Sequence, residues 1–70
     1  MELMGTFLQK NVIPQNAAYN LLISANDDYY DIEVEADIMP NLQKGDKIYL
    51  RMDKNHEVTT IEILERMQEA

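Results

Sequence analysis

Charged and apolar residues alternate without interruption along residues 31–38, the clearest pattern in the chain. Side chains of a β-strand point to opposite faces in turn, so this alternation is typical of a strand with one buried face. The residues expected to point inward are Ile32, Val34, Ala36 and Ile38. Those expected to point outward are Asp31, Glu33, Glu35 and Asp37.

A second alternating stretch, residues 47–52, predicts a strand with Lys47, Tyr49 and Arg51 on its outer face. Residues 53–57 read as a hairpin turn in which Asn55 is the natural candidate for a left-handed backbone. The β-branched residues of 58–64 predict the returning strand.

Upstream, residues 6–13 predict a first strand that Pro14 ends, and residues 19–24 predict a second strand. Pro40 is expected to end the third strand, and residues 41–44 leave room for one helical turn. Gly45 and Asp46 supply a tight turn into the fourth strand. The tail, residues 65–70, is rich in helix formers, which predicts a short helix.

Five short strands in 70 residues predict a single all-β domain, with a core over residues 5–64 and a tail over 65–70. Closing the sheet into a small barrel would remove its exposed edges. Three features of the sequence resemble an OB-fold. Gly5 opens the first strand, residues 19–37 are expected to form a hairpin, and within residues 42–48 Leu42 is followed by Gly45-Asp46. The same Leu-x-x-Gly-Asp entry occurs in SH3-like barrels, and the connection before it has no room for a true helix. We therefore expect an OB-like or SH3-like small barrel.

Composition excludes several classes of protein. Thirteen acidic residues against six basic ones give a net charge of −7, which disfavours general binding to nucleic acid or to membrane surfaces. The absence of cysteine excludes disulfides and thiol chemistry. No apolar run approaches the roughly 20 residues of a membrane span, and no secretory leader is evident, so cytoplasmic residence is the default expectation.

No chemistry-bearing constellation stands out. His56 and Ser24 are the sole histidine and serine, and neither has the context of a catalytic nucleophile or base. The acidic turn at residues 26–31 lacks the central glycine and distal glutamate of a calcium loop. Two glycines forty residues apart cannot build a phosphate-binding loop. We expect no enzyme activity, no cofactor and no metal site.

The charge layout is the most informative feature. Residues 27–37 contain six acidic residues and no basic one, whereas residues 44–54 hold four of the six basic residues. A solvated sheet face is one interpretation of this layout. The main functional hypothesis is a non-enzymatic module whose acidic strand (Asp31, Glu33, Glu35, Asp37) binds a basic protein partner, with inhibition or nucleic-acid mimicry as specific forms.

Two alternatives stay open. The spacing Lys47-x-Tyr49-x-Arg51 places an aromatic ring between two cations on one face, a combination used by binders of single-stranded nucleic acid or oligosaccharides. The net charge disfavours the nucleic-acid version. In the second alternative the chain self-associates as a homodimer, with the acidic strand of one copy facing the basic strand of another.

Overall fold

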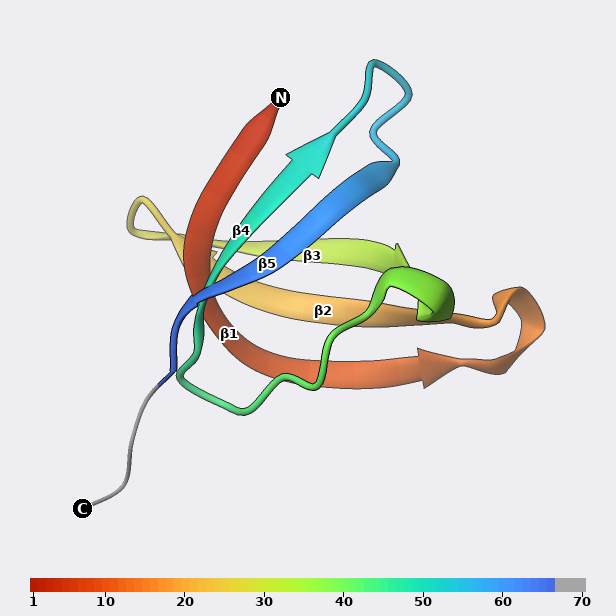
Figure 1. The fold of residues 1–70 in the computed structure, drawn as a ribbon, viewed down its shortest axis with the longest axis horizontal. Coiled ribbons are helices and arrows are strands. Elements are labelled where there is room, and N and C mark those ends of the chain that lie inside the picture. Colours follow the sequence, from red (N-terminus) through yellow and green to blue (C-terminus); the bar gives the residue numbers. More distant parts are fainter. Residues whose placement is uncertain (67–70) are drawn as a thin grey trace.

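The computed structural model describes residues 1–66 as one curved sheet of five antiparallel strands (Figure 1). The strands are β1 (Glu2–Ile13), β2 (Ala18–Ala25), β3 (Asp28–Glu35), β4 (Lys47–Met52) and β5 (Val58–Glu65). Two short 3-10 helices, η1 (Pro14–Asn16) and η2 (Ala36–Ile38), lie in the connections. The prediction of an all-β fold with five strands is confirmed.

The strand order is β3-β2-β1-β4-β5, so the long β1 is shared by the two halves of the sheet. Its first half pairs with β4, from Glu2 opposite Arg51 to Thr6 opposite Lys47. Its second half pairs with β2, ending with Ile13 opposite Ala18. Three consecutive antiparallel strands with a fourth returning beside the first form a Greek key.

Gly5 lies where β1 bends between its two partners (Figure 1). A Cβ atom at this position would lie 2.6 Å from the Ser24 carbonyl oxygen and 2.7 Å from Cγ2 of Ile23. The bend therefore brings β1 against β2 more closely than any side chain would allow. An irregularity in register between Phe7 and Gln9 adds to the curvature.

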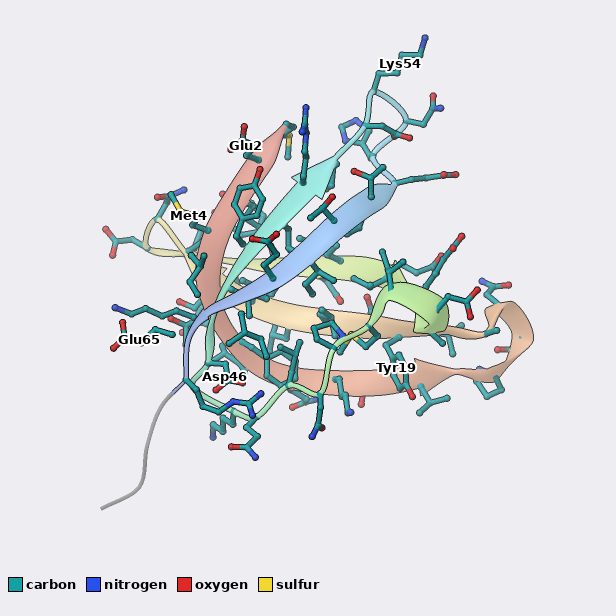
Figure 2. The ribbon with its side chains drawn as sticks, in the orientation of Figure 1. Glu2, Met4, Tyr19, Asp46, Lys54 and Glu65 are labelled. Carbon is teal, nitrogen blue, oxygen red and sulfur yellow. The ribbon has the colours of Figure 1, made fainter. Side chains whose placement is uncertain are left out.

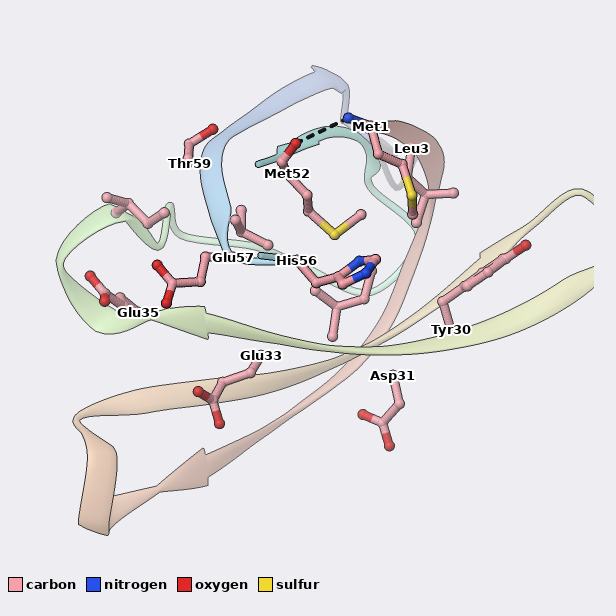
Figure 3. A pocket seen from close by; sticks show the side chains of 13 residues that line it. Met1, Leu3, Tyr30, Asp31, Glu33, Glu35, Met52, His56, Glu57 and Thr59 are labelled. Carbon is pink, nitrogen blue, oxygen red and sulfur yellow. Dashed lines mark hydrogen bonds between the residues drawn. The ribbon is translucent and has the colours of Figure 1, made fainter. Parts of the chain in front are cut away.

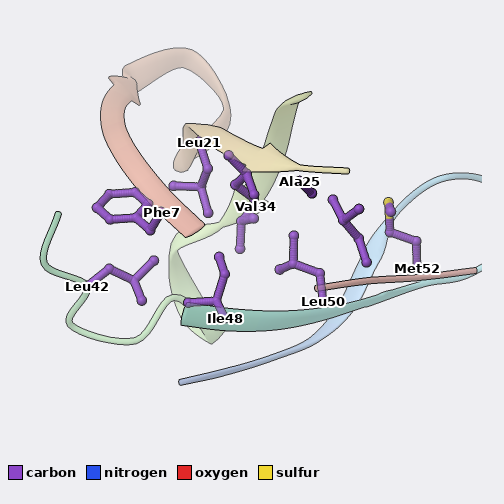
Figure 4. Packing of buried hydrophobic residues seen from close by; sticks show 10 residues of the cluster. Phe7, Leu21, Ala25, Val34, Leu42, Ile48, Leu50 and Met52 are labelled. Atoms are coloured by element: carbon purple, nitrogen blue, oxygen red, sulfur yellow. The ribbon is translucent and has the colours of Figure 1, made fainter. Parts of the chain in front are cut away.

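The curvature wraps the sheet around one apolar core (Figure 4). Inward residues of β1, β2, β3 and β4 fill it, and Leu21, Ile23, Ile48 and Leu50 have no exposed surface. Leu42 closes the core from the connection between η2 and β4. The inward residues of β5 are only half-buried, because no further strand covers them.

The expected closure into a barrel is wrong. β3 and β5 stand at the two ends of the strand order and are not hydrogen-bonded to each other. β3 ends at Glu35, where the chain turns into η2 and Ala36 donates its backbone N–H to the Ala17 carbonyl oxygen at 3.0 Å. Two free strand edges therefore remain.

Several local predictions are corrected. The third strand covers residues 28–35 rather than 31–38, so Asp37 lies in η2 and Pro40 does not end the strand. The helical turn expected at residues 41–44 lies instead at Ala36–Ile38. The first strand begins at Glu2, so Gly5 lies inside it rather than at its start.

Of the tail expected to be helical, Glu65 belongs to β5 and Arg66 is not helical; residues 67–70 lie outside the described part. The bounds predicted for the fourth strand, 47–52, are confirmed. Pro14 ends β1 as expected, and Gly45 (φ 97°) forms the tight turn before β4.

Candidate protein-binding edge

The acidic residues singled out by the sequence follow the free edge of β3. Asp31, Glu33 and Glu35 are exposed and alternate with the inward residues Ile32 and Val34. We call these three carboxylates the acidic edge. Asp37 is also exposed, but it lies on η2 and does not extend their row.

Nothing in the described chain neutralises the acidic edge. Its cross-strand partners on β2 are Leu22, Asn20 and Ala18, and none of them carries a charge. The two ion pairs found within residues 1–66 join Lys47 to Glu65 and Arg66 to Asp46. Same-face neighbours on a strand are about 6.8 Å apart, so the three carboxylates form a repulsive row exposed to solvent.

The β2–β3 hairpin sets the start of this row. Asn26 and Asp27 both have positive φ angles, 53° and 63°, which is typical of a tight two-residue hairpin turn. The Asp28 carboxylate accepts a hydrogen bond from the Tyr29 backbone N–H at 2.8 Å. Tyr29 lies opposite Ser24 and is 69% exposed, so an aromatic side chain continues the outer face of the acidic edge.

A groove of about 620 Å³ lies beside β3, on the side where the sheet stays open (Figure 3). Leu3, Ile32, Met52 and Val58 supply apolar surface from β1, β3, β4 and β5. In Figure 3, Asp31 and Glu33 lie across β3 from His56. Asp31, Glu33 and Glu35 also belong to its lining, so the groove combines apolar surface with the carboxylates of the acidic edge.

The β4–β5 hairpin forms the opposite rim of the groove. The Asp53 carboxylate accepts hydrogen bonds from the backbone N–H groups of Asn55 at 2.8 Å and Glu57 at 3.1 Å. This network leaves His56, not the expected Asn55, in the left-handed conformation, with φ of 63°. His56 and Glu57 both line the groove.

The basic strand has a different setting. Lys47, Tyr49 and Arg51 share the outer face of β4, as predicted, but β4 lies between β1 and β5 and has no free edge (Figure 2). Their cross-strand neighbours include the carboxylates Glu2, Glu62 and Glu65. Lys47 Nζ lies 3.7 Å from the Glu65 carboxylate. The cations are therefore interleaved with acids rather than gathered into a positive patch.

The surroundings of Tyr49 raise the pKa of its phenol. Partial removal from water raises the pKa of its phenol above 10.0, and so does a hydrogen bond with the Glu2 carboxylate. The charges of Glu2 and Glu62 raise this pKa further, while Arg51 acts in the opposite direction. The ring of Tyr49 is half-buried, which reduces the area on which a base could stack.

Other site types find no support in residues 1–66. No three histidine, aspartate or glutamate side chains there come together as a set that could hold a metal ion. The same residues include no helix with the length and apolarity to cross a membrane.

The acidic edge is visible in the sequence, whereas the groove is not. The groove has no motif of its own, because its residues come from the N-terminal residue, four strands, η2 and the β4–β5 turn. The one available signal was the apolar character of Ile32 and Val58, which lie on strands at the two ends of the sheet. Comparisons with models of protein families, with curated proteins and with solved structures found no match.

Proposed function

We propose that this chain is a non-enzymatic interaction module that binds a basic protein partner through the acidic edge of β3. One observation carries the proposal: three outward carboxylates line a strand that is hydrogen-bonded to β2 on one edge and free on the other, and no cation among the described residues is paired with them. Such a row speeds the approach of a basic partner and sets its register.

The open Greek-key sheet supports the OB-like alternative for the architecture, since that family is a five-stranded, partly open Greek-key barrel. Fold does not determine function, however, so the proposal rests on the edge itself. Binding of single-stranded nucleic acid through Lys47, Tyr49 and Arg51 is less supported, because the carboxylates of Glu2, Glu62 and Glu65 surround that face.

The test compares capture of basic proteins from a native extract by three immobilised forms of the chain. Glu33→Lys/Glu35→Lys reverses the acidic edge. The control, Glu62→Lys/Glu65→Lys, changes the net charge equally but lies on β5. The proposal expects salt-sensitive 1:1 capture by the wild type and by the control, and none by the edge variant. Equal loss in both variants would mean that only the overall charge matters.

A further inference from the structure

We infer that the partner binds as an extended, basic segment that adds to the free edge of β3 as a sixth strand, beside the groove. This inference rests on the proposed function and specifies its mode. Main-chain pairing at an exposed sheet edge is a recurrent way of recognising peptides, with alternate side chains giving specificity.

The first support is the unfinished sheet. β3 is a terminal strand, so every second residue presents an unpaired backbone N–H and C=O group toward the gap. On the other side of the gap, β5 is also a terminal strand. Some Cα atoms of β3 and β5 lie within 8 Å of each other, so an added strand would pair with β3 only where the two strands are farther apart. A strand added here would satisfy backbone groups that now depend on water.

The second support is the incompletely covered apolar surface inside the gap. Ile32, Ile38 and Val58 pack against the core but remain half-buried. They line the groove together with the buried Leu3 and Met52. A volume of about 620 Å³ lies in the range of roughly 300–1,000 Å³ typical of binding sites. Inward side chains of an added strand would cover this surface.

The third support is the charge on the opposite face. Outward side chains of an added strand would stand directly beside Asp31, Glu33 and Glu35, at the separation of cross-strand pairs. The β2 side offers these carboxylates no cation. A segment that alternates lysine or arginine with apolar residues therefore fits both faces at once.

The same geometry disfavours a second copy of this chain as the occupant. Pairing β3 with β3 would set carboxylates beside carboxylates, which is destabilising. β4, which carries the basic residues, is enclosed by β1 and β5 and cannot pair at an edge. Phosphates of a nucleic acid would be repelled by the acidic edge.

The experiment is an amide-resolved NMR titration of the full chain at low salt with three synthetic peptides. The first alternates lysine and valine. The second has the same composition with the lysines grouped together. The third alternates but is N-methylated on alternate residues, which blocks main-chain pairing. We expect the first to bind, with shifts along β3 and in the groove, and the others to bind at least about tenfold more weakly.

A second readout uses the variant Glu33→Gln/Glu35→Gln, which changes exposed side chains and leaves the core intact. We expect it to weaken binding of the alternating peptide by about tenfold. Equal binding of all three peptides would overturn strand addition and leave the proposed function standing. No shift on β3 with any peptide, together with no edge-dependent capture of basic proteins, would overturn both.

Discussion

The Asp46 carboxylate lies 3.5 Å from Nε of Arg66 and has no exposed surface, although it sits at the entrance to β4. It also accepts a hydrogen bond from the Gln43 backbone N–H at 2.9 Å. Arg66 in turn donates to the Asn41 carbonyl oxygen. One buried acid thus ties the end of β5 to the connection that leads into β4.

We predict that Asp46→Ala lowers the free energy of unfolding by about 2 kcal/mol, because the Gln43 N–H loses its acceptor and Arg66 loses its partner. Asp46→Asn should cost less, since its side-chain oxygen can still accept from Gln43. Denaturant unfolding measures both variants. If Asp46→Ala unfolds at the same denaturant midpoint as the wild type, the contacts of Asp46 with Gln43 and Arg66 do not stabilise the fold.

Gly5→Ala should destabilise the protein by about 1–3 kcal/mol, the usual cost of forcing atoms into a packed site. The added methyl group would collide with the Ser24 carbonyl and with Ile23 at the bend of β1. Met4→Ala, at the neighbouring exposed position, is the matched control and should change stability by less than about 0.5 kcal/mol. Thermal unfolding measures both variants. Equal melting temperatures would show that the close approach of β1 to β2 at Gly5 does not exclude a side chain there.

The raised pKa of Tyr49 predicts that the folded protein loses stability in strong alkali. Its folded pKa is raised above 10.0, so its contribution is fully present below pH 10 and is lost as the pH rises through the folded value. Removing the Glu2 carboxylate by Glu2→Gln should lower this pKa toward its ordinary value.

The check is an absorbance titration of tyrosinate, with Tyr49→Phe subtracted to isolate this phenol from the other three tyrosines. A Tyr49 phenol that ionises at or below pH 10, or one indifferent to Glu2→Gln, would show that the Glu2 contact does not form in solution.

Neutralising the acidic edge should stabilise the isolated chain slightly. In Glu33→Gln/Glu35→Gln the like-charge repulsion along β3 falls, and we expect a gain of about 0.5 kcal/mol that shrinks with added salt. The loss of charge also removes the repulsion that keeps the β3 edges of two copies from pairing. Sedimentation of this variant at high concentration should therefore show more self-association than that of the wild type. Equal self-association of the two proteins would show that the carboxylates do not prevent edge pairing.

Local alternation predicted much of this fold, and its failures have physical reasons. The bounds of β4 followed from period-two patterning, with Pro14 and Gly45 marking turns as expected. The same alternation continues through Asp37 and Ile38, yet β3 ends at Glu35, because the Ala36 N–H bonds to Ala17 and the chain turns away. Patterning reports which face is buried, not where pairing stops.

The site was predictable only in part for a similar reason. Outward carboxylates are visible in the sequence, and the structure places three of the four on one strand edge. The groove depends on how far β3 and β5 diverge, which no short segment encodes. His56 reaches the groove because hydrogen bonds to the Asp53 carboxylate fix the conformation of the β4–β5 hairpin. Asparagine favours the left-handed conformation, so the sequence predicts it at Asn55, whereas the hairpin places it at His56.

The most direct test of the acidic edge as the binding surface is a pair of amide-resolved NMR titrations on the full chain. One uses the alternating lysine–valine peptide and the other a short single-stranded oligonucleotide, both at low salt. We predict shifts along Asp31, Glu33 and Glu35 with the peptide, and none on Lys47, Tyr49 and Arg51 with the oligonucleotide. The proposal would be contradicted if the oligonucleotide shifted the amide signals of the β4 face and the peptide shifted none on β3.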